Sequence, residues 1–180
     1  MTGGQQLKPI FRPMTEAEAR AIAAWRYEGS YAFYNMPEGV ADDPGYLREL
    51  LDPENPYYAA YDSRGELVGF LAFGDPARVG TTAEREAAYG GEEALDVGLG
   101  LRPDLTGQGL GLAFVEAGLA FARKRFAPVR FRLSVAAFNH RAIRVYERAG
   151  FRRVLTTTLD SSGGPREFVI MVRDAGEVEG

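Results

Sequence analysis

Hydrophobic and polar positions in the first third of the chain predict one strand and two helices. Lys8 to Met14 is expected to form a strand. Thr15-Glu16-Ala17-Glu18 has the spacing of a capping box, with Thr15 as N-cap of a helix that runs to about Arg26. Residues 27–43 mix aromatics with glycine and proline, which favours a loop or a broken helix. Asp43-Pro44 then predicts a short helix that ends at Leu51.

The middle of the chain is dominated by strand patterns. Tyr57 to Tyr61 and Glu66 to Phe73 read as strands around the turn Ser63-Arg64-Gly65, which predicts a hairpin. Residues 74–92 are rich in glycine, alanine and charge, and we expect a long hairpin loop there. Ala94 to Leu101 predicts the next strand, and Leu110 to about Arg125 predicts a well-buried helix.

The last third alternates strand and helix before a closing hairpin. Val129 to Val135 predicts a strand, and the helix Asn139 to Ala149 has one apolar face, while Gly150 suits a left-handed cap. A terminal hairpin is expected from Phe151 to Leu159 and from Glu167 to Val172. Because strands run together before they alternate with helices, the order favours an α+β fold with a mixed sheet. The apolar face of the helix consists of Ala142, Val145, Tyr146 and Ala149.

The composition fits one globular domain, expected over residues 7–175, and removes several classes of chemistry. Residues 1–6 resemble an expression-leader remnant or a disordered tail. The 180 residues include no cysteine and one histidine, His140, so disulfides, thiolate catalysis and Cys/His metal clusters are excluded within one chain. No apolar run approaches the roughly 20 residues of a membrane helix. We therefore expect no metal, no membrane partner and a cytoplasmic location.

Charge is distributed unevenly along the chain. Residues 102–153 carry a net charge of +8, whereas the whole chain carries −4. A basic segment in an acidic protein suggests a local anionic ligand, and a solvated arginine-rich face explains it equally well. The acidic total argues against nucleic acid as a partner.

A glycine-rich turn separates the predicted strand at 94–101 from the helix after it. Gly107, Gly109 and Gly111 remove three side chains where the helix begins, so free N–H groups and the positive end of the helix dipole could bind a phosphate. Taken alone, the turn favours a plainer interpretation, a tight corner that binds nothing. A P-loop is excluded because Gly111 is followed by Leu112.

The turn becomes specific when it is read with a second motif. The pattern L-x-P-x-x-T-G-Q-G-L-G begins at Leu101, and N-x-x-A-x-x-x-Y-E-x-x-G-F follows from Asn139. The pair resembles the GNAT superfamily of N-acetyltransferases. The resemblance implies a mixed, mostly antiparallel central sheet of about seven strands flanked by about four helices. It also implies acetyl-CoA as co-substrate and no metal.

The same resemblance implies which residues hold the coenzyme. Backbone N–H groups of the turn would hold the pyrophosphate, the strand before it would bind the pantetheine arm and acyl carbonyl, and Asn139 would lie near the pantetheine. Asn139 is equally suited to a plain helix N-cap. Thr106 stands where the family usually has arginine or glutamine, so the resemblance implies no contact from a long side chain at this position. The implied positions are Leu99, Gly100, Leu101, Thr106, Gly107, Gln108, Gly109, Leu110, Gly111 and Asn139.

Catalytic positions also follow from the resemblance. Tyr146 matches the tyrosine that protonates the leaving thiolate, which a phenol within hydrogen-bond reach can do. The general base corresponds to a position near Asp96, with Glu92 and Glu93 as neighbours to test. An ordinary exposed acid is an equal interpretation for each of the three.

The acceptor wall corresponds to the aromatic segment after the first helix. We expect Tyr27, Glu28, Tyr31 and Tyr34 to bind the acceptor, since aromatic rings with a carboxylate can hold a cationic amine.

The predicted function is acetyl transfer from acetyl-CoA to a primary amine, in a small molecule or a peptide, by direct attack in a ternary complex. A non-catalytic acyl-CoA-sensing module on the same fold is the alternative. A homodimer is a further expectation.

Overall fold

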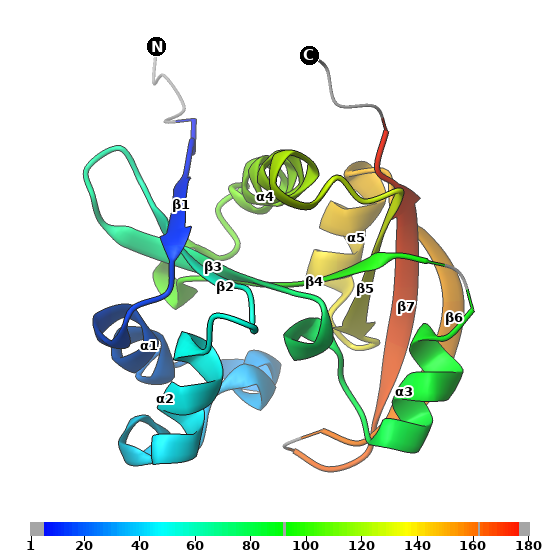
Figure 1. The fold of residues 1–180 in the computed structure, drawn as a ribbon, viewed down its shortest axis with the longest axis horizontal. Helices are drawn as coiled ribbons and strands as arrows, with labels where there is room; N and C mark the ends of the chain where they lie inside the picture. The colour runs from blue at the N-terminus through cyan, green and yellow to red at the C-terminus, as the bar shows by residue number, and fades with distance from the viewer. Residues whose placement is uncertain (1–5, 92, 162, 177–180) are drawn as a thin grey trace.

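The computed structural model describes residues 6–91, 93–161 and 163–176 and shows a seven-stranded sheet in the order β1-β2-β3-β4-β5-β7-β6 (Figure 1). Strands β4 and β5 are parallel, and the other neighbouring strands are antiparallel. The predicted α+β fold with a mixed, mostly antiparallel sheet is confirmed. The strands are β1 (Ile10–Pro13), β2 (Tyr57–Tyr61), β3 (Leu67–Phe73), β4 (Leu95–Leu101), β5 (Arg130–Ala136), β6 (Arg152–Leu159) and β7 (Arg166–Asp174).

Helices cover both faces of this sheet. On one face α4 and α5 enclose the largest apolar cluster, and on the other α1 and α2 pack over β2 and β3 (Figure 1). Residues of β7 alternate between the faces, with Val169 and Met171 in the first cluster and Phe168 and Ile170 in a third one beside α3. The α-helices are α1 (Glu16–Ala23), α2 (Pro44–Leu51), α3 (Thr82–Tyr89), α4 (Gly111–Phe126) and α5 (His140–Arg148), and the short 3-10 helices are η1 (Gly29–Tyr34), η2 (Val40–Asp42), η3 (Asp75–Ala77) and η4 (Pro103–Leu105).

Helix α3 corrects the expectation of a loop over residues 74–92. The Thr81 side chain accepts from the Glu84 N–H, and the Glu84 carboxylate accepts from the Thr81 N–H, so a complete capping box starts the helix. At the other end Tyr89 is buried, and its hydroxyl accepts from the Val79 N–H at 3.0 Å. A cap at one end and a buried aromatic at the other stabilise a helix whose composition alone reads as a loop.

The capping box predicted for α1 does not form. Thr15 is the N-cap, but its side chain makes no capping hydrogen bond. The Glu18 carboxylate instead accepts from the Tyr61 hydroxyl of β2, which joins the helix to the sheet. A tertiary partner therefore replaced the local one that the spacing predicted.

Two predictions for α5 are confirmed: the residues of its apolar face and the left-handed glycine after its C-terminus. Ala149 is buried, and Ala142, Val145 and Tyr146 pack against the cluster beneath α4 and α5. Gly150 has φ +93°, the left-handed conformation expected after the helix.

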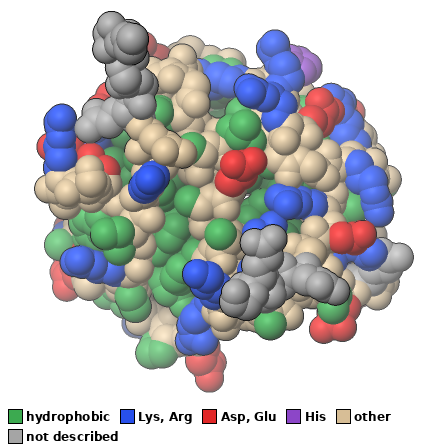
Figure 2. Space-filling model, turned by 90° about the horizontal axis from the view of Figure 1, so that it is seen from above, with side chains coloured by type: hydrophobic (Ala, Val, Ile, Leu, Met, Phe, Trp, Pro, Cys, Tyr) green, Lys and Arg blue, Asp and Glu red, His purple; other side chains and the backbone are tan. Residues whose placement is uncertain are grey.

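Charged side chains of both signs are spread over the face that holds α4 (Figure 2). No helix in the described part of the chain has the length and apolarity needed to cross a membrane.

Candidate active site

The sheet splits between its two parallel strands. β4 and β5 pair at Leu95 with Phe131 and at Asp96 with Arg132. Beyond that point β4 stays paired with β3 as far as Leu101, and β5 with β7 as far as Ala136. A cleft of about 620 Å³ opens where the strands separate, within the size range of small-molecule sites.

The glycine turn lies at the rim of this cleft and presents unpaired donors. Gly107 and Gly109 have φ values of +73° and +77°, in the left-handed region that glycine adopts readily. None of the backbone N–H groups of residues 107–113 donates to another described residue, and the first capping bond of α4 is from Phe114 to Leu110. Free donors at the start of a 16-residue helix make a site suited to phosphate.

The polar side chains of the turn hold the turn itself. The Thr106 hydroxyl donates to the Pro103 carbonyl at 2.7 Å, which closes η4. The Gln108 side chain donates back to the Asp104 carbonyl, and Gln108 does not line the cleft. An anion here would therefore meet backbone N–H groups. Thr106 is too short to replace the family's usual arginine or glutamine, and Gln108 does not take over that contact.

Arg141 supplies a positive charge beside the turn. Its guanidinium carbon lies 4.3 Å from the centroid of the Tyr31 ring, and a Cβ atom at position 107 would lie 3.2 Å from Nη1 of Arg141. Arg141 is not among the coenzyme positions expected from the sequence, although its place two residues after the N-cap Asn139 was a usable signal.

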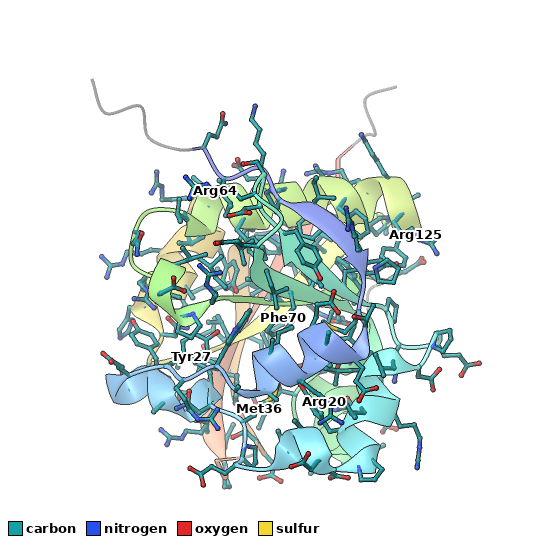
Figure 3. All side chains as sticks on the ribbon, turned by 90° about the vertical axis from the view of Figure 1, so that its left-hand side faces the viewer. Arg20, Tyr27, Met36, Arg64, Phe70 and Arg125 are labelled. Atoms are coloured by element: carbon teal, nitrogen blue, oxygen red, sulfur yellow. The ribbon has the colours of Figure 1, made fainter. Side chains whose placement is uncertain are left out.

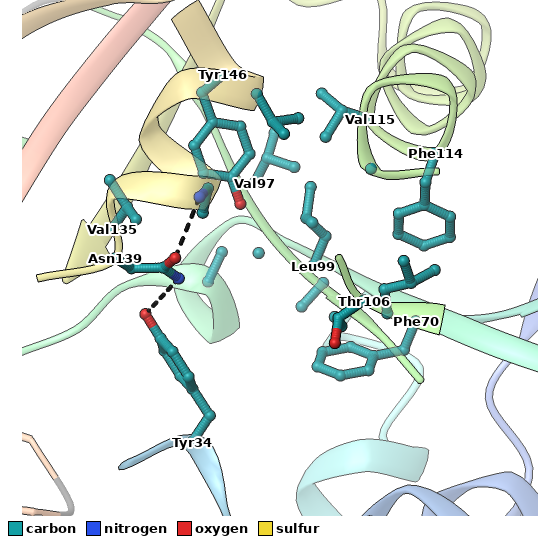
Figure 4. Close-up of a pocket in the computed structure, with 18 of the residues that line it drawn as sticks. Tyr34, Phe70, Val97, Leu99, Thr106, Phe114, Val115, Val135, Asn139 and Tyr146 are labelled. Atoms are coloured by element: carbon teal, nitrogen blue, oxygen red, sulfur yellow. Dashed lines mark hydrogen bonds between the residues drawn. The ribbon is translucent and has the colours of Figure 1, made fainter. Parts of the chain in front are cut away.

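Asn139 joins the two walls of the cleft (Figure 4). Its Oδ1 accepts from the Ala142 N–H at 3.1 Å, so it caps α5, while Nδ2 donates to the Tyr34 hydroxyl at 3.0 Å. Tyr34 belongs to η1, and burial raises the pKa of its hydroxyl despite the hydrogen bond from Asn139.

Tyr146 projects from α5 into the cleft, with its ring 6.0 Å from that of Phe151 (Figure 4). Its hydroxyl has no hydrogen-bond partner among the described residues. Burial raises the pKa of this hydroxyl above its ordinary value, so it remains a neutral phenol. An unpartnered, protonated phenol in a cleft is suited to donate a proton.

Asp96 lies outside the cleft and is already paired. Its carboxylate accepts from Arg132 at 2.6 and 2.9 Å and from Arg78 at 2.8 Å, and its side chain is almost wholly buried. Two guanidinium groups occupy its oxygens, which argues against the expected role as base. Glu93 is exposed and does not line the cleft, and Glu92 lies outside the described residues.

The expected acceptor segment closes one side of the cleft. The Tyr27 hydroxyl donates to the Leu101 carbonyl at 2.8 Å, and burial raises its pKa to about 12. Glu28 is exposed and does not line the cleft. Of the positions expected from the sequence, Leu110, Gln108, Asp96 and Glu28 are absent from the lining. Those that line it are Tyr27, Tyr31, Tyr34, Leu99, Gly100, Leu101, Thr106, Gly107, Gly109, Gly111, Asn139 and Tyr146.

Comparison with known proteins gives the family. Residues 17–151 match the model of the Acetyltransferase (GNAT) family. The chain belongs to the GNAT acetyltransferase family.

Two curated relatives of this GNAT chain are mycothiol acetyltransferases. That of Acidothermus cellulolyticus is 34% identical over 164 residues, which are 86% of this chain and 47% of the relative. That of Salinispora arenicola is 32% identical over 149 residues, 79% and 43% of the two chains. This GNAT chain therefore spans less than half the length of either relative.

Solved GNAT structures share the fold at low identity. A spermidine N-acetyltransferase from Vibrio cholerae in complex with CoA and spermine has a TM-score of 0.70 and 15% identity, covering 93% of this chain and 96% of that one. A putative phosphinothricin N-acetyltransferase has a TM-score of 0.66 and 16% identity, covering 94% and 99%. At this identity the likeness concerns the fold.

Proposed function

We propose that this chain transfers the acetyl group of acetyl-CoA to a primary amine, by direct attack in a ternary complex. The observation that supports it best is the split between β4 and β5, which leads from the free N–H groups of residues 107–113 to the unpartnered hydroxyl of Tyr146. An anion site and a proton donor along one cleft suit an acyl thioester whose far end carries phosphates.

The residues present fit acetyl-CoA. The donors at the turn and the guanidinium of Arg141 would hold the pyrophosphate, and the part of β4 that has left β5 would lie beside the pantetheine arm. That part includes Leu99 and Gly100, which line the cleft.

Acetyl transfer needs two contributions from the protein: a fixed position for the reactants and a proton for the leaving sulfur. When acetyl-CoA is bound, it supplies a thioester whose carbonyl carbon the amine nitrogen attacks, so that a C–N bond forms and the C–S bond breaks. Tyr146 would donate its phenolic proton to the sulfur, and the proton that the nitrogen gives up would return through solvent to the Tyr146 oxygen, so the protons balance. The Tyr34–Asn139 hydrogen bond would hold η1 against the N-terminus of α5.

Two measurements test this function. Calorimetry should show binding of acetyl-CoA and of CoA, and no binding of either at millimolar concentration would overturn the proposal. Release of CoA over a panel of amines can be read with a thiol reagent without background from the protein, because the sequence has no cysteine. Binding without turnover of any amine would favour the acyl-CoA-sensing alternative.

The comparisons suggest one candidate for the acceptor. The names of the two curated relatives favour the amine form of mycothiol, on sequence likeness alone.

Gly109→Ala should weaken CoA binding about tenfold, because a side chain at φ +77° costs about 1–2 kcal/mol and the strain would turn the peptide N–H groups away. Calorimetric titration with CoA measures the effect. Gly65→Ala is the matched control, since Gly65 has φ +79°, has equally open surroundings and lies in the β2–β3 turn. Equal CoA affinity in both variants would contradict a role for the turn.

A further inference from the structure

The cleft continues from the glycine turn into a second apolar region under α1 and α2. Ile22, Leu50 and Met14 are buried members of the cluster there, and they also line the cleft. Figure 3 shows Met36 on the segment between α1 and α2, with Phe70 above it on β3. We call this part the acceptor region; the cleft residues that form it are Met14, Ile22, Trp25, Met36, Leu50, Tyr57 and Phe70.

Phe70 makes the acceptor region continuous with β4. A Cβ atom at position 100 would overlap the Phe70 ring, so the ring lies against the bare backbone of Gly100. On the other side the Trp25 ring lies 6.3 Å from that of Phe70. A ligand beside β4 would therefore meet aromatic and aliphatic side chains.

The described residues of the acceptor region include no acidic side chain. Among the described residues that line the cleft, the charged side chains are Arg141 and Arg148, and the other titratable ones are Tyr27, Tyr31, Tyr34, Tyr57 and Tyr146. Glu49 accepts from the Tyr57 hydroxyl at 3.2 Å and Glu18 from the Tyr61 hydroxyl, and neither acid lines the cleft. A polycation bound here would lose its hydration without gaining a carboxylate partner.

We propose that the acceptor is a primary amine with an apolar aryl or alkyl body, bound in its neutral form. The proposal rests on the acetyl transfer proposed above and names its substrate class. Burial of the body against the acceptor region supplies the binding energy, since that energy scales with the apolar area removed from water. Desolvation among these apolar side chains disfavours the ammonium form.

Binding the neutral amine also removes the need for a base. Asp96 is held by Arg132 and Arg78, and no carboxylate lines the described part of the cleft. The amine then loses its first proton in solution. Its second proton leaves the nitrogen after attack and returns through solvent to the Tyr146 oxygen, which has protonated the sulfur. The rate should therefore rise with pH until the amine's own pKa is passed.

Trp25 provides a binding assay that does not depend on turnover, because it is the chain's one tryptophan and it lines the cleft. In the presence of CoA and at a pH above the pKa of phenethylamine, 2-phenylethanol should quench or shift Trp25 fluorescence as strongly as phenethylamine. The permanently charged phenethyl-trimethylammonium should bind at least about tenfold more weakly. Trp25→Phe should abolish the signal. Equal affinity for the trimethylammonium compound would overturn the proposal of a neutral ligand.

Activity over two sets of amines tests the substrate class. Phenethylamine and octylamine should exceed spermidine and cadaverine in kcat/KM by at least about tenfold. For two apolar amines whose solution pKa values differ widely, the inflection of kcat/KM against pH should move with the amine. An inflection fixed at one pH for both amines would overturn the neutral-amine proposal in favour of an enzyme base.

A designed carboxylate should reverse the preference. Met36→Glu places an acid in the acceptor region and should raise kcat/KM for cadaverine relative to phenethylamine. Leu51→Glu is the matched control, because Leu51 is exposed and does not line the cleft. Turnover confined to spermidine or to the amine form of mycothiol would overturn the apolar substrate class and leave acetyl transfer standing. Failure to bind acetyl-CoA would instead overturn the proposed function.

Discussion

Replacing Asp96 with alanine should lower the free energy of unfolding by about 3–5 kcal/mol. The Asp96 carboxylate is 1% exposed and Arg132 is 5% exposed, so the substitution leaves a buried guanidinium without its partner. Arg78 loses its closer partner too and keeps Asp75 at 3.9 Å. The pair lies on the last paired residues of β4 and β5, and its loss should loosen the sheet where the cleft begins. Urea unfolding followed by circular dichroism measures the change.

Two further variants serve as comparisons for the stability loss of Asp96→Ala. Glu147→Ala removes the exposed pair between Glu147 and Arg153 and should cost less than about 1 kcal/mol. The double variant Asp96→Leu with Arg132→Met removes both charges and should recover much of the lost stability. A loss for Asp96→Ala no larger than that for Glu147→Ala would contradict the structural role.

Asp96→Asn separates stability from catalysis, because asparagine keeps the shape and one acceptor oxygen. If Asp96 only joins the strands, a folded Asp96→Asn variant should keep the pH profile of kcat/KM seen in the unchanged protein. A profile that loses its rise with pH would restore Asp96 as the base.

The sequence could predict part of this cluster. Alternation along β4 places Asp96 on the face opposite Val97 and Leu99, which pack toward α4. Its partners could not be predicted, since one is Arg78, from a segment expected to be a loop. Side-chain pairing between distant segments depends on tertiary placement, which local patterns do not specify.

The same limit explains α1 and α3. The spacing from Thr15 to Glu18 matches a capping box, yet Glu18 bonds Tyr61 across the sheet. The spacing from Thr81 to Glu84 is equally good and does form the box, in a segment whose glycines and charges suggested a loop. Local spacing thus identifies where a cap can form, and the tertiary partners available decide whether it does.

The coenzyme side of the cleft was more predictable than the acceptor side. A glycine turn at a strand–helix junction depends on local backbone geometry, and the positive φ values of Gly107 and Gly109 agree with it. The acceptor region joins α1, α2, β2 and β3, and its lack of a lining carboxylate among the described residues depends on where Glu28 and Glu49 point. The expected pairing of aromatic rings with Glu28 is not what the structure shows.

Replacing Tyr146 with phenylalanine should lower kcat by about 10²-fold or more while CoA affinity stays nearly unchanged. The phenyl ring keeps its packing against Phe151, and the hydroxyl that is lost has no partner among the described residues. Because burial raises the pKa of Tyr146, the rate of the unchanged protein should not fall as pH passes about 10, the ordinary value for tyrosine. Pre-steady-state measurement of CoA release, with calorimetry for CoA binding, checks both expectations.

The size of the Tyr146→Phe defect should depend on the leaving group. A thioester whose thiol is more acidic needs less protonation as the C–S bond breaks, so the deficit should shrink with such a donor. Tyr58→Phe is the matched control, since Tyr58 packs among Phe73 and Phe121 and does not line the cleft. Equal kcat in both variants would remove Tyr146 from the mechanism. A deficit independent of the thiol would instead assign its hydroxyl to positioning, because protonation of sulfur is the step that thiol acidity changes.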